Sequence, residues 1–185
     1  SRRTVLSLPA APALISARGE KPNVMMVVLD DLGCRDLGYL GAKDLQTPNI
    51  DALANAGVRF PNWYSNAPVC APSRASIVSG RYPARAGVPS NGLALTAGIP
   101  TLGAQFKAGG YRTAAIGKWH LGEDDATCPN GHGFEYFYGF HNGCIDFYSH
   151  RFYWGEPKRV NFHDLWRNRS EVFDDGRYFT ERIAE

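Results

Sequence analysis

Cys70 and Arg74, one helical turn apart, are the first pair of side chains whose types and spacing could do chemistry. Pro72 suits the first turn of a helix because its missing N–H would have no partner there, and Gly80 can end that helix. Cys70 is therefore expected just before a helix N-terminus, where backbone N–H groups and the helix dipole favour an anion. The guanidinium of Arg74 can bind the same anion. The stretch predicts a nucleophile beside an anion-binding site, although a buried structural cysteine fits this stretch alone equally well.

Lys118 and His120 form the second such pair. They follow residues 111–116, which we expect to be a core strand. Side chains two positions apart on an extended chain lie on the same face, so both could reach one oxyanion. An isolated pair of this kind more often consists of a lysine whose stem packs on the core and a buried histidine.

Asp30 and Asp31 are adjacent carboxylates that follow an apolar run over residues 24–29. Six apolar residues without alternation predict a strand buried on both faces, as in the middle of a parallel sheet. Ligands gather at the carboxyl ends of such strands. Two neighbouring carboxylates repel each other unless a cation lies between them, and their hard oxygens favour calcium or magnesium. The alternative is a solvated turn after the strand.

The rest of the chain predicts elements that position these side chains. We expect helices over residues 48–56, 101–108 and 178–185, a short strand over 58–64, and a loop over 83–100. Thr47 is expected to be the N-cap of the first helix. His141 and His150 lie in an aromatic-rich stretch over 134–154, where aromatic packing under a long loop is one interpretation.

Composition limits the class of protein. The chain has 185 residues, 44% of them hydrophobic, and a net charge of +2. This is enough for one domain with a core, and the charge is too small to indicate a nucleic-acid partner. No apolar run is long enough to span a membrane. The four cysteines form no Cys-x-x-Cys pair, and Cys128 and Cys144 could form a disulfide in an oxidising compartment or stay reduced.

Residues 1–19 are expected to lie outside the fold. Arg2 and Arg3 precede a modest apolar segment with small residues at its end. This resembles a twin-arginine export signal without its initiator methionine, which would send the protein to the periplasm or out of the cell. The alternative is a disordered tail.

Two long stretches together resemble the signatures of the type I sulfatases. Residues 68–80 resemble the first signature, with Ser79 where that family usually has threonine or alanine, and residues 110–120 resemble the second at every specified position. The resemblance implies an α/β fold, an alkaline-phosphatase-like sandwich with a mostly parallel central sheet flanked by helices. Residues 20–185 would be the N-terminal part of the catalytic domain, incomplete in this chain.

The resemblance also implies a modified nucleophile and a metal. Cys70 would be oxidised to formylglycine by a formylglycine-generating or anaerobic sulfatase-maturating enzyme. Its hydrate would attack the sulfur of a sulfate monoester, release the alcohol, and then expel sulfate to restore the aldehyde. Asp30 and Asp31 would supply the first two ligands of Ca²⁺, with Mg²⁺ possible.

The remaining signature residues receive roles from the same resemblance. Arg74 would stabilise the hydrate, Lys118 would bridge the nucleophile and the sulfate, and His120 would take the proton during elimination. His141 and His150 are weaker candidates for substrate binding. The other metal ligands, a second lysine and the acid that protonates the leaving group are expected beyond residue 185.

The expected activity is hydrolysis of sulfate monoesters, with a sulfated small molecule or glycan as substrate. One alternative is a phosphate or phosphonate ester hydrolase of the same superfamily, which shares the metal and the anion site. Another is a binding domain without catalysis. Conversion of Cys70 separates the enzymes from the binding domain, and a comparison of sulfate with phosphate esters separates the two enzymes.

Overall fold

A computed structural model describes residues 21–154, 161–174 and 176–185. The predicted export segment, residues 1–19, lies outside the described residues. The chain divides into two compact units at Gly57. We call the described residues up to Gly57 unit 1 and those from Val58 onward unit 2. None of the helices in the described part is both long and apolar enough to cross a membrane.

Unit 1 contains the short 3-10 helix η1 (Gly38–Leu40) and the helix α1 (Pro48–Ala56), which confirms the predicted helix. Thr47 is the N-cap residue, but its hydroxyl does not cap the helix. It accepts a hydrogen bond from Gly38 N at 2.8 Å and donates to Asp51 Oδ1 at 3.0 Å. Asp51 Oδ1 also accepts from Tyr39 N at 3.0 Å, so these two side chains join η1 to α1.

The apolar run in unit 1 differs from its prediction as a buried strand. Residues 24–29 form no regular element, and all six side chains are exposed, Met25 to 89%. A strand is defined by hydrogen bonds to a neighbouring strand, and the sheet of the described residues is built entirely from unit 2. Residues 24–29 therefore have the composition of a core strand. They have no partner strand among the described residues.

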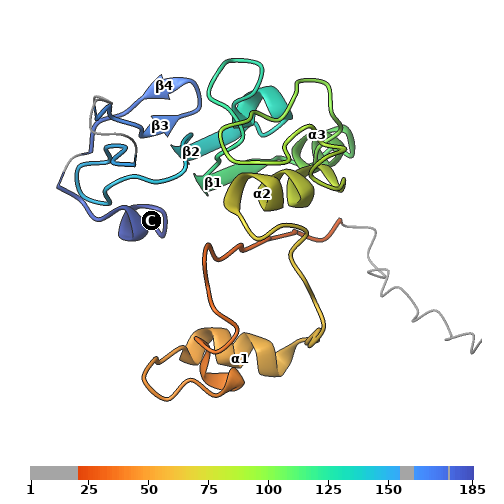
Figure 1. Ribbon diagram of the computed structural model, residues 1–185, viewed down its shortest axis with the longest axis vertical. Coiled ribbons are helices and arrows are strands. Elements are labelled where there is room, and N and C mark those ends of the chain that lie inside the picture. Colours follow the sequence, from red (N-terminus) through yellow and green to blue (C-terminus); the bar gives the residue numbers. More distant parts are fainter. Residues whose placement is uncertain (1–20, 155–160, 175) are drawn as a thin grey trace, which may run out of the picture. The chain divides into compact units, whose positions relative to one another are not determined.

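Unit 2 contains an α/β arrangement (Figure 1). Its elements are α2 (Cys70–Ser79), α3 (Leu102–Ala108), β1 (Ala114–Lys118), η2 (Pro129–His132), β2 (Tyr136–Phe140), β3 (Trp166–Arg167), β4 (Ser170–Glu171) and α4 (Phe179–Arg182). The predicted strand over 58–64 is absent, and the predicted C-terminal helix is limited to the single turn of α4. The predicted core strand begins at Ala114 instead of 111 and extends through Lys118.

The strands of unit 2 form one mixed sheet in the order β1-β2-β3-β4. β1 and β2 are parallel, whereas β2–β3 and β3–β4 are antiparallel, so the described sheet is not mostly parallel as predicted. Gly117 lies opposite Gly139 in the parallel pair. A Cβ at Gly139 would lie 2.0 Å from the Gly117 carbonyl oxygen. The close pairing of these strands therefore requires glycine at position 139.

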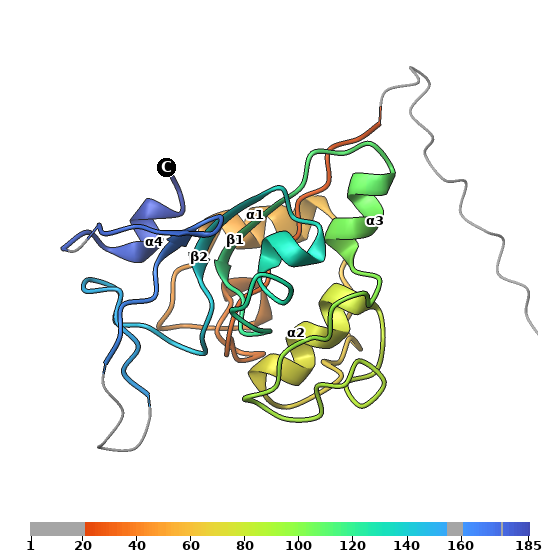
Figure 2. The same ribbon diagram turned by 90° about the horizontal axis from the view of Figure 1, so that it is seen from above.

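Alternation along β2 divides the core of unit 2 between the two faces of the sheet. Phe137 packs with Trp119 and with Ala71 and Ala75 of α2. Tyr138 and Phe140 point to the opposite face and pack with a second cluster that includes Phe179 of α4. Figure 2 shows α2 and α3 on one side of β1 and β2, with α4 on the other.

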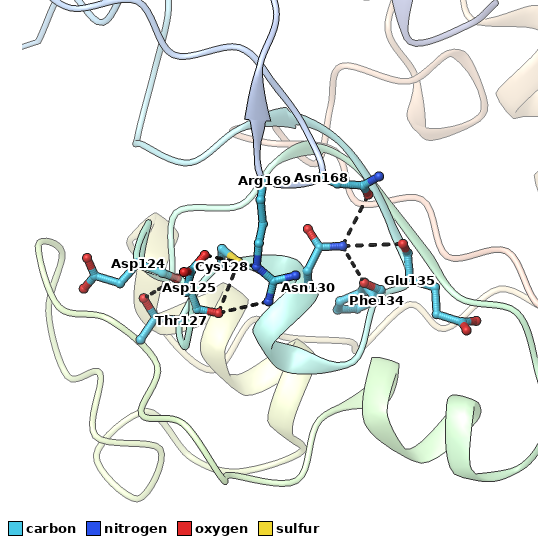
Figure 3. A network of polar contacts seen from close by, with 9 residues as sticks. All are labelled: Asp124, Asp125, Thr127, Cys128, Asn130, Phe134, Glu135, Asn168 and Arg169. Atoms are coloured by element: carbon cyan, nitrogen blue, oxygen red, sulfur yellow. Dashed lines mark hydrogen bonds and ion pairs between the residues drawn. The ribbon is translucent and has the colours of Figure 1, made fainter.

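The turn between β3 and β4 contacts the loop that follows the second signature (Figure 3). Asn168 Oδ1 accepts hydrogen bonds from Phe137 N at 2.9 Å and Asn130 Nδ2 at 3.3 Å. Arg169 pairs with Asp125 at 3.0 Å. The same loop buries Cys128, whose thiol donates to the Asp125 carbonyl. The four cysteines, all among the described residues, form no disulfide, so the bridge between Cys128 and Cys144 is not present.

Candidate active site

Cys70 is the first residue of α2 in unit 2, not the residue before the helix as predicted. Its side chain is half-buried. The next backbone N–H, of Ala71, donates to Asn91 Oδ1 at 2.9 Å, and that of Ser73 donates to the Val69 carbonyl at 3.2 Å. Pro72 has no N–H to offer. Three of the first four positions thus lack an N–H for an anion, and binding must rely more on side chains than we predicted.

Arg74 joins the two signature stretches. Its guanidinium Nη1 donates a hydrogen bond to the backbone carbonyl of Lys118, the last residue of β1. Arg74 and Lys118 are both half-buried. The contact brings the N-terminal half of α2 against the carboxyl end of β1, where open α/β sheets bind their ligands. Two cationic side chains from separate signatures therefore originate at one end of the sheet.

The backbone of His120 is not extended, although an extended conformation was predicted for it. Its φ is 60°, in the left-handed region that non-glycine residues seldom adopt. The simple argument that Lys118 and His120 share a face of one strand therefore does not hold, because alternation ends before His120. The backbone is held instead by the N–H of His120, which donates to the His141 carbonyl at 2.9 Å. Such a conformation persists only when its surroundings determine it.

The imidazole of His120 lies against the backbone of Gly143. A Cβ added at Gly143 would lie 2.9 Å from Nε2 and 3.0 Å from Cε1 of that ring. The loop that follows β2 thus contacts both the backbone and the side chain of His120. Sequence reasoning missed Gly143, and it missed Asn91 beside the start of α2, since each is a common residue in a loop whose partner is distant in the sequence.

His141 and His150 are enclosed by the protein. His141 is 4% exposed, and its ring stacks on Phe137 at a centroid distance of 5.1 Å and on Trp166 at 5.0 Å. Desolvation lowers the pKa of His141, opposed by the negative charges of Asp164 and Glu123. His150 is fully buried, with Phe179 and His163 as ring neighbours. These positions favour the packing interpretation over direct substrate contact.

Asp30 and Asp31 are the candidate metal ligands, and both lie exposed in unit 1 after the apolar run. The φ of Asp31 is 56°, so the chain turns sharply between the two carboxylates and the neighbouring segment. This turn breaks the alternation that would send adjacent side chains of a strand to opposite faces. Two adjacent carboxylates are also a donor set that suits Ca²⁺ or Mg²⁺. The pair fits a partial shell for a hard cation.

The comparison with protein families identifies the class. The sulfatase family matches residues 22–185, so the chain belongs to the sulfatase family. Human arylsulfatase G is 40% identical over 138 residues, which are 70% of this chain and 26% of that protein. The chain thus spans about a quarter of the length of this curated relative.

Solved structures are similar to most of the chain. One is Ps i-CgsB, solved in complex with k-i-k-neocarrahexaose, with a TM-score of 0.78 and 32% identity over 88% of this chain and 39% of that chain. Another was solved in complex with its substrate D-glucosamine-2-N,6-O-disulfate, with a TM-score of 0.72 and 27% identity over 88% of this chain and 29% of that chain. The predicted family is confirmed, and both structures hold sugars.

Proposed function

We propose that this chain is part of a sulfatase that hydrolyses sulfate monoesters on glycans, with Cys70 converted to formylglycine as the nucleophile. The observation that carries the proposal is the hydrogen bond from Arg74 to the Lys118 carbonyl, which joins the two signatures at one end of the sheet. Membership of the sulfatase family and the sugars bound by the two similar structures support the substrate class.

Each side chain then has a chemical task. Arg74 and Lys118 neutralise the charge of the sulfate, which must be spread and stabilised as the ester bond breaks. Position 70, at the start of α2, places the nucleophile at the positive end of the helix dipole. His120 holds and moves the proton that must leave the nucleophile's hydroxyl group when sulfate is expelled.

Asp30 and Asp31 are proposed to hold Ca²⁺, with Mg²⁺ as the alternative. When bound, the cation would polarise the sulfate oxygens and lower the pKa of the nucleophile's hydroxyl group. The carboxylates themselves fix the cation and offset its charge. Two ligands are fewer than such a cation requires, so other oxygen ligands of the intact protein must complete the shell.

The finer fold also belongs to this proposal. We infer that the intact protein has an alkaline-phosphatase-like sandwich with a mostly parallel central sheet, in which residues 24–29 form a core strand. Their continuous apolar composition supports this, since strands buried on both faces have that pattern. The paired arginines Arg2 and Arg3 support export to the periplasm or beyond.

The decisive experiment compares an aryl sulfate with the matched aryl phosphate, using the intact protein co-expressed with a maturating enzyme. We expect a lower mass for the peptide that contains Cys70, hydrolysis of the sulfate ester, and much slower hydrolysis of the phosphate ester. A panel of sulfated sugars then identifies the preferred glycan.

The matched variants are Cys70→Ala and Cys34→Ala. Cys34 is an exposed cysteine of unit 1, so its replacement should leave turnover unchanged. Cys70→Ala should abolish turnover without changing the melting temperature, because the half-buried site is not a packed core. Full activity in Cys70→Ala would exclude the mechanism. A preference for phosphate would favour the phosphate or phosphonate hydrolase, and converted protein without any turnover would favour a binding domain.

A further inference from the structure

Asp164 is a buried carboxylate that the signatures do not contain. It is 1% exposed, and it follows the isolated bridge residue His163 on the approach to β3. A carboxylate in such a position must be fully hydrogen-bonded, because burial without partners is strongly unfavourable. The donors that satisfy it therefore indicate what Asp164 holds in place.

Four N–H groups donate to Asp164. Oδ1 accepts from His141 N at 3.1 Å and from Trp166 Nε1 at 2.8 Å. Oδ2 accepts from Asn142 N at 2.8 Å and from Asn142 Nδ2 at 3.0 Å. Both oxygens thus hold consecutive backbone groups of the loop after β2, and all four donors suit a group that only accepts.

The same loop determines the conformation of His120. The carbonyl of His141 accepts from His120 N at 2.9 Å, which helps to hold the left-handed backbone of His120. Gly143, the next residue after the two that Asp164 holds, lies against the imidazole. A continuous chain of contacts therefore runs from the Asp164 carboxylate through residues 141–143 to the backbone and ring of His120.

The geometry points to Asp164 as a positioning residue that sets the orientation of the His120 imidazole through residues 141–143, with Gly143 as the surface on which the ring rests. This inference rests on the proposed function only for the role of His120 in proton transfer. Asp164 does not touch the reacting atoms. Asp164 holds residues 141 and 142 in place, and Gly143 in the same loop sets the position of the His120 ring.

Two variants test the two ends of this chain of contacts. Asp164→Asn replaces one acceptor oxygen by an amide group, so either the Asn142 donors or the His141 and Trp166 donors face another donor. Gly143→Ala adds a methyl group where the ring now lies, and the φ of Gly143 is not in the left-handed region, so the ring should move instead of the backbone. Asp174→Asn and Gly109→Ala are the matched controls, the first removing the ion pair with Arg182.

The measurements are kcat and KM of the intact, converted protein for an aryl sulfate, its melting temperature, and the ring signals of ¹⁵N-labelled histidine in unconverted protein carrying Cys70→Ala. We expect kcat to fall about 100-fold in Asp164→Asn and roughly tenfold in Gly143→Ala, because small misplacements of a catalytic group have effects of this size. KM should change little, and the His120 signals should shift in both variants and in neither control.

Unchanged His120 signals in both variants would overturn the inference, as would shifted signals with wild-type kcat. The inference would also be overturned if Asp174→Asn lowered both the melting temperature and kcat as much as Asp164→Asn does. That result would show a general structural role for the Asp164 carboxylate. If the wild-type protein hydrolyses no sulfate ester, the proposed function fails, and the histidine signals alone decide whether Asp164 orients His120.

Discussion

Two segments that the sequence predicts as core strands have different surroundings in the two units. Ala114–Lys118 in unit 2 pairs with β2 along its whole length, whereas residues 24–29 in unit 1 are exposed and form no regular element. Both segments lead directly into residues with proposed chemical roles. The difference teaches that an apolar run predicts the potential for a strand, and that a hydrogen-bonded neighbour is needed to form one.

The residues after the two segments differ in the same way. His120 follows β1 and is held by the neighbouring loop through its N–H and its ring. Asp31 follows residues 24–29 and, like His120, has a positive φ, but it is exposed. In the proposed function a cation would bind the exposed carboxylates, whereas contacts with the neighbouring loop hold His120.

The largest effect is expected from removing a proposed metal ligand in unit 1. Asp31→Ala should lower kcat by about 1,000-fold or more and remove bound Ca²⁺, because the proposed cation would stabilise the charge that develops on the sulfate. Metal content by mass spectrometry and turnover of an aryl sulfate measure both effects. Asp44→Ala, an exposed aspartate of the same unit, should change neither. Normal metal content and activity in Asp31→Ala would show that this carboxylate is not a ligand.

The next effect concerns the stability of the paired strands in unit 2. Gly139→Ala places a methyl group against the Gly117 carbonyl and should lower the free energy of unfolding by about 3 kcal/mol. Gly41→Ala in unit 1 meets no atom within 4 Å, but its φ of 101° should still cost about 1 kcal/mol. Urea unfolding of the intact protein measures both, and equal losses would show that β1 and β2 are not closely paired.

A smaller effect tests whether residues 24–29 are a core strand in the intact protein. Met25→Lys should lower its free energy of unfolding by about 2 kcal/mol, the value for a buried methionine side chain. In the 185-residue chain, where Met25 is 89% exposed, the change should stay within about 0.5 kcal/mol. Thermal melting of both proteins gives the comparison. A similar small change in both would exclude the core strand.

The smallest effect concerns pH, and it should belong to unit 2, which contains all five histidines of the sequence. Desolvation lowers the pKa of His132 and of His141 in the folded state. The unfolded chain therefore binds more protons as the pH falls below the ordinary histidine value of about 6.5, and the folded state loses stability in that range. Above about pH 6.5 both histidines are neutral in the folded and in the unfolded chain, so they cause no loss of stability there.

His141→Phe tests this pH dependence. Phenylalanine keeps the stacking on Phe137 and Trp166, and neither ring nitrogen of His141 has a hydrogen-bond partner among the described residues. Its melting temperature should match the wild type at pH 7.5 and fall less on going to pH 5. An identical fall would show that His141 does not contribute. A raised KM would support the substrate contact that the sequence left open.

The local features were predictable because neighbouring residues determine them. Gly80 ends α2 with a φ of 66°, and Pro48 begins α1 after Thr47, as glycine and proline at those positions predict. The pairing of β2 with β3 was not predicted, because these strands are two to five residues long and their partners lie far apart in the chain. Asp164 was missed for the same reason, since its donors lie 22 and 23 residues away as well as two residues away.

The sequence by itself determined the family and the identity of the signature side chains, Cys70, Arg74, Lys118 and His120, because reactive groups at fixed spacing are a property of the chain. The tertiary structure decided how those groups are held. It placed the Arg74 guanidinium on the Lys118 carbonyl, turned His120 out of the strand and set the loop of residues 141–143 against it. These arrangements depend on hydrogen bonds between segments distant in sequence, and local patterns carry no record of such partners.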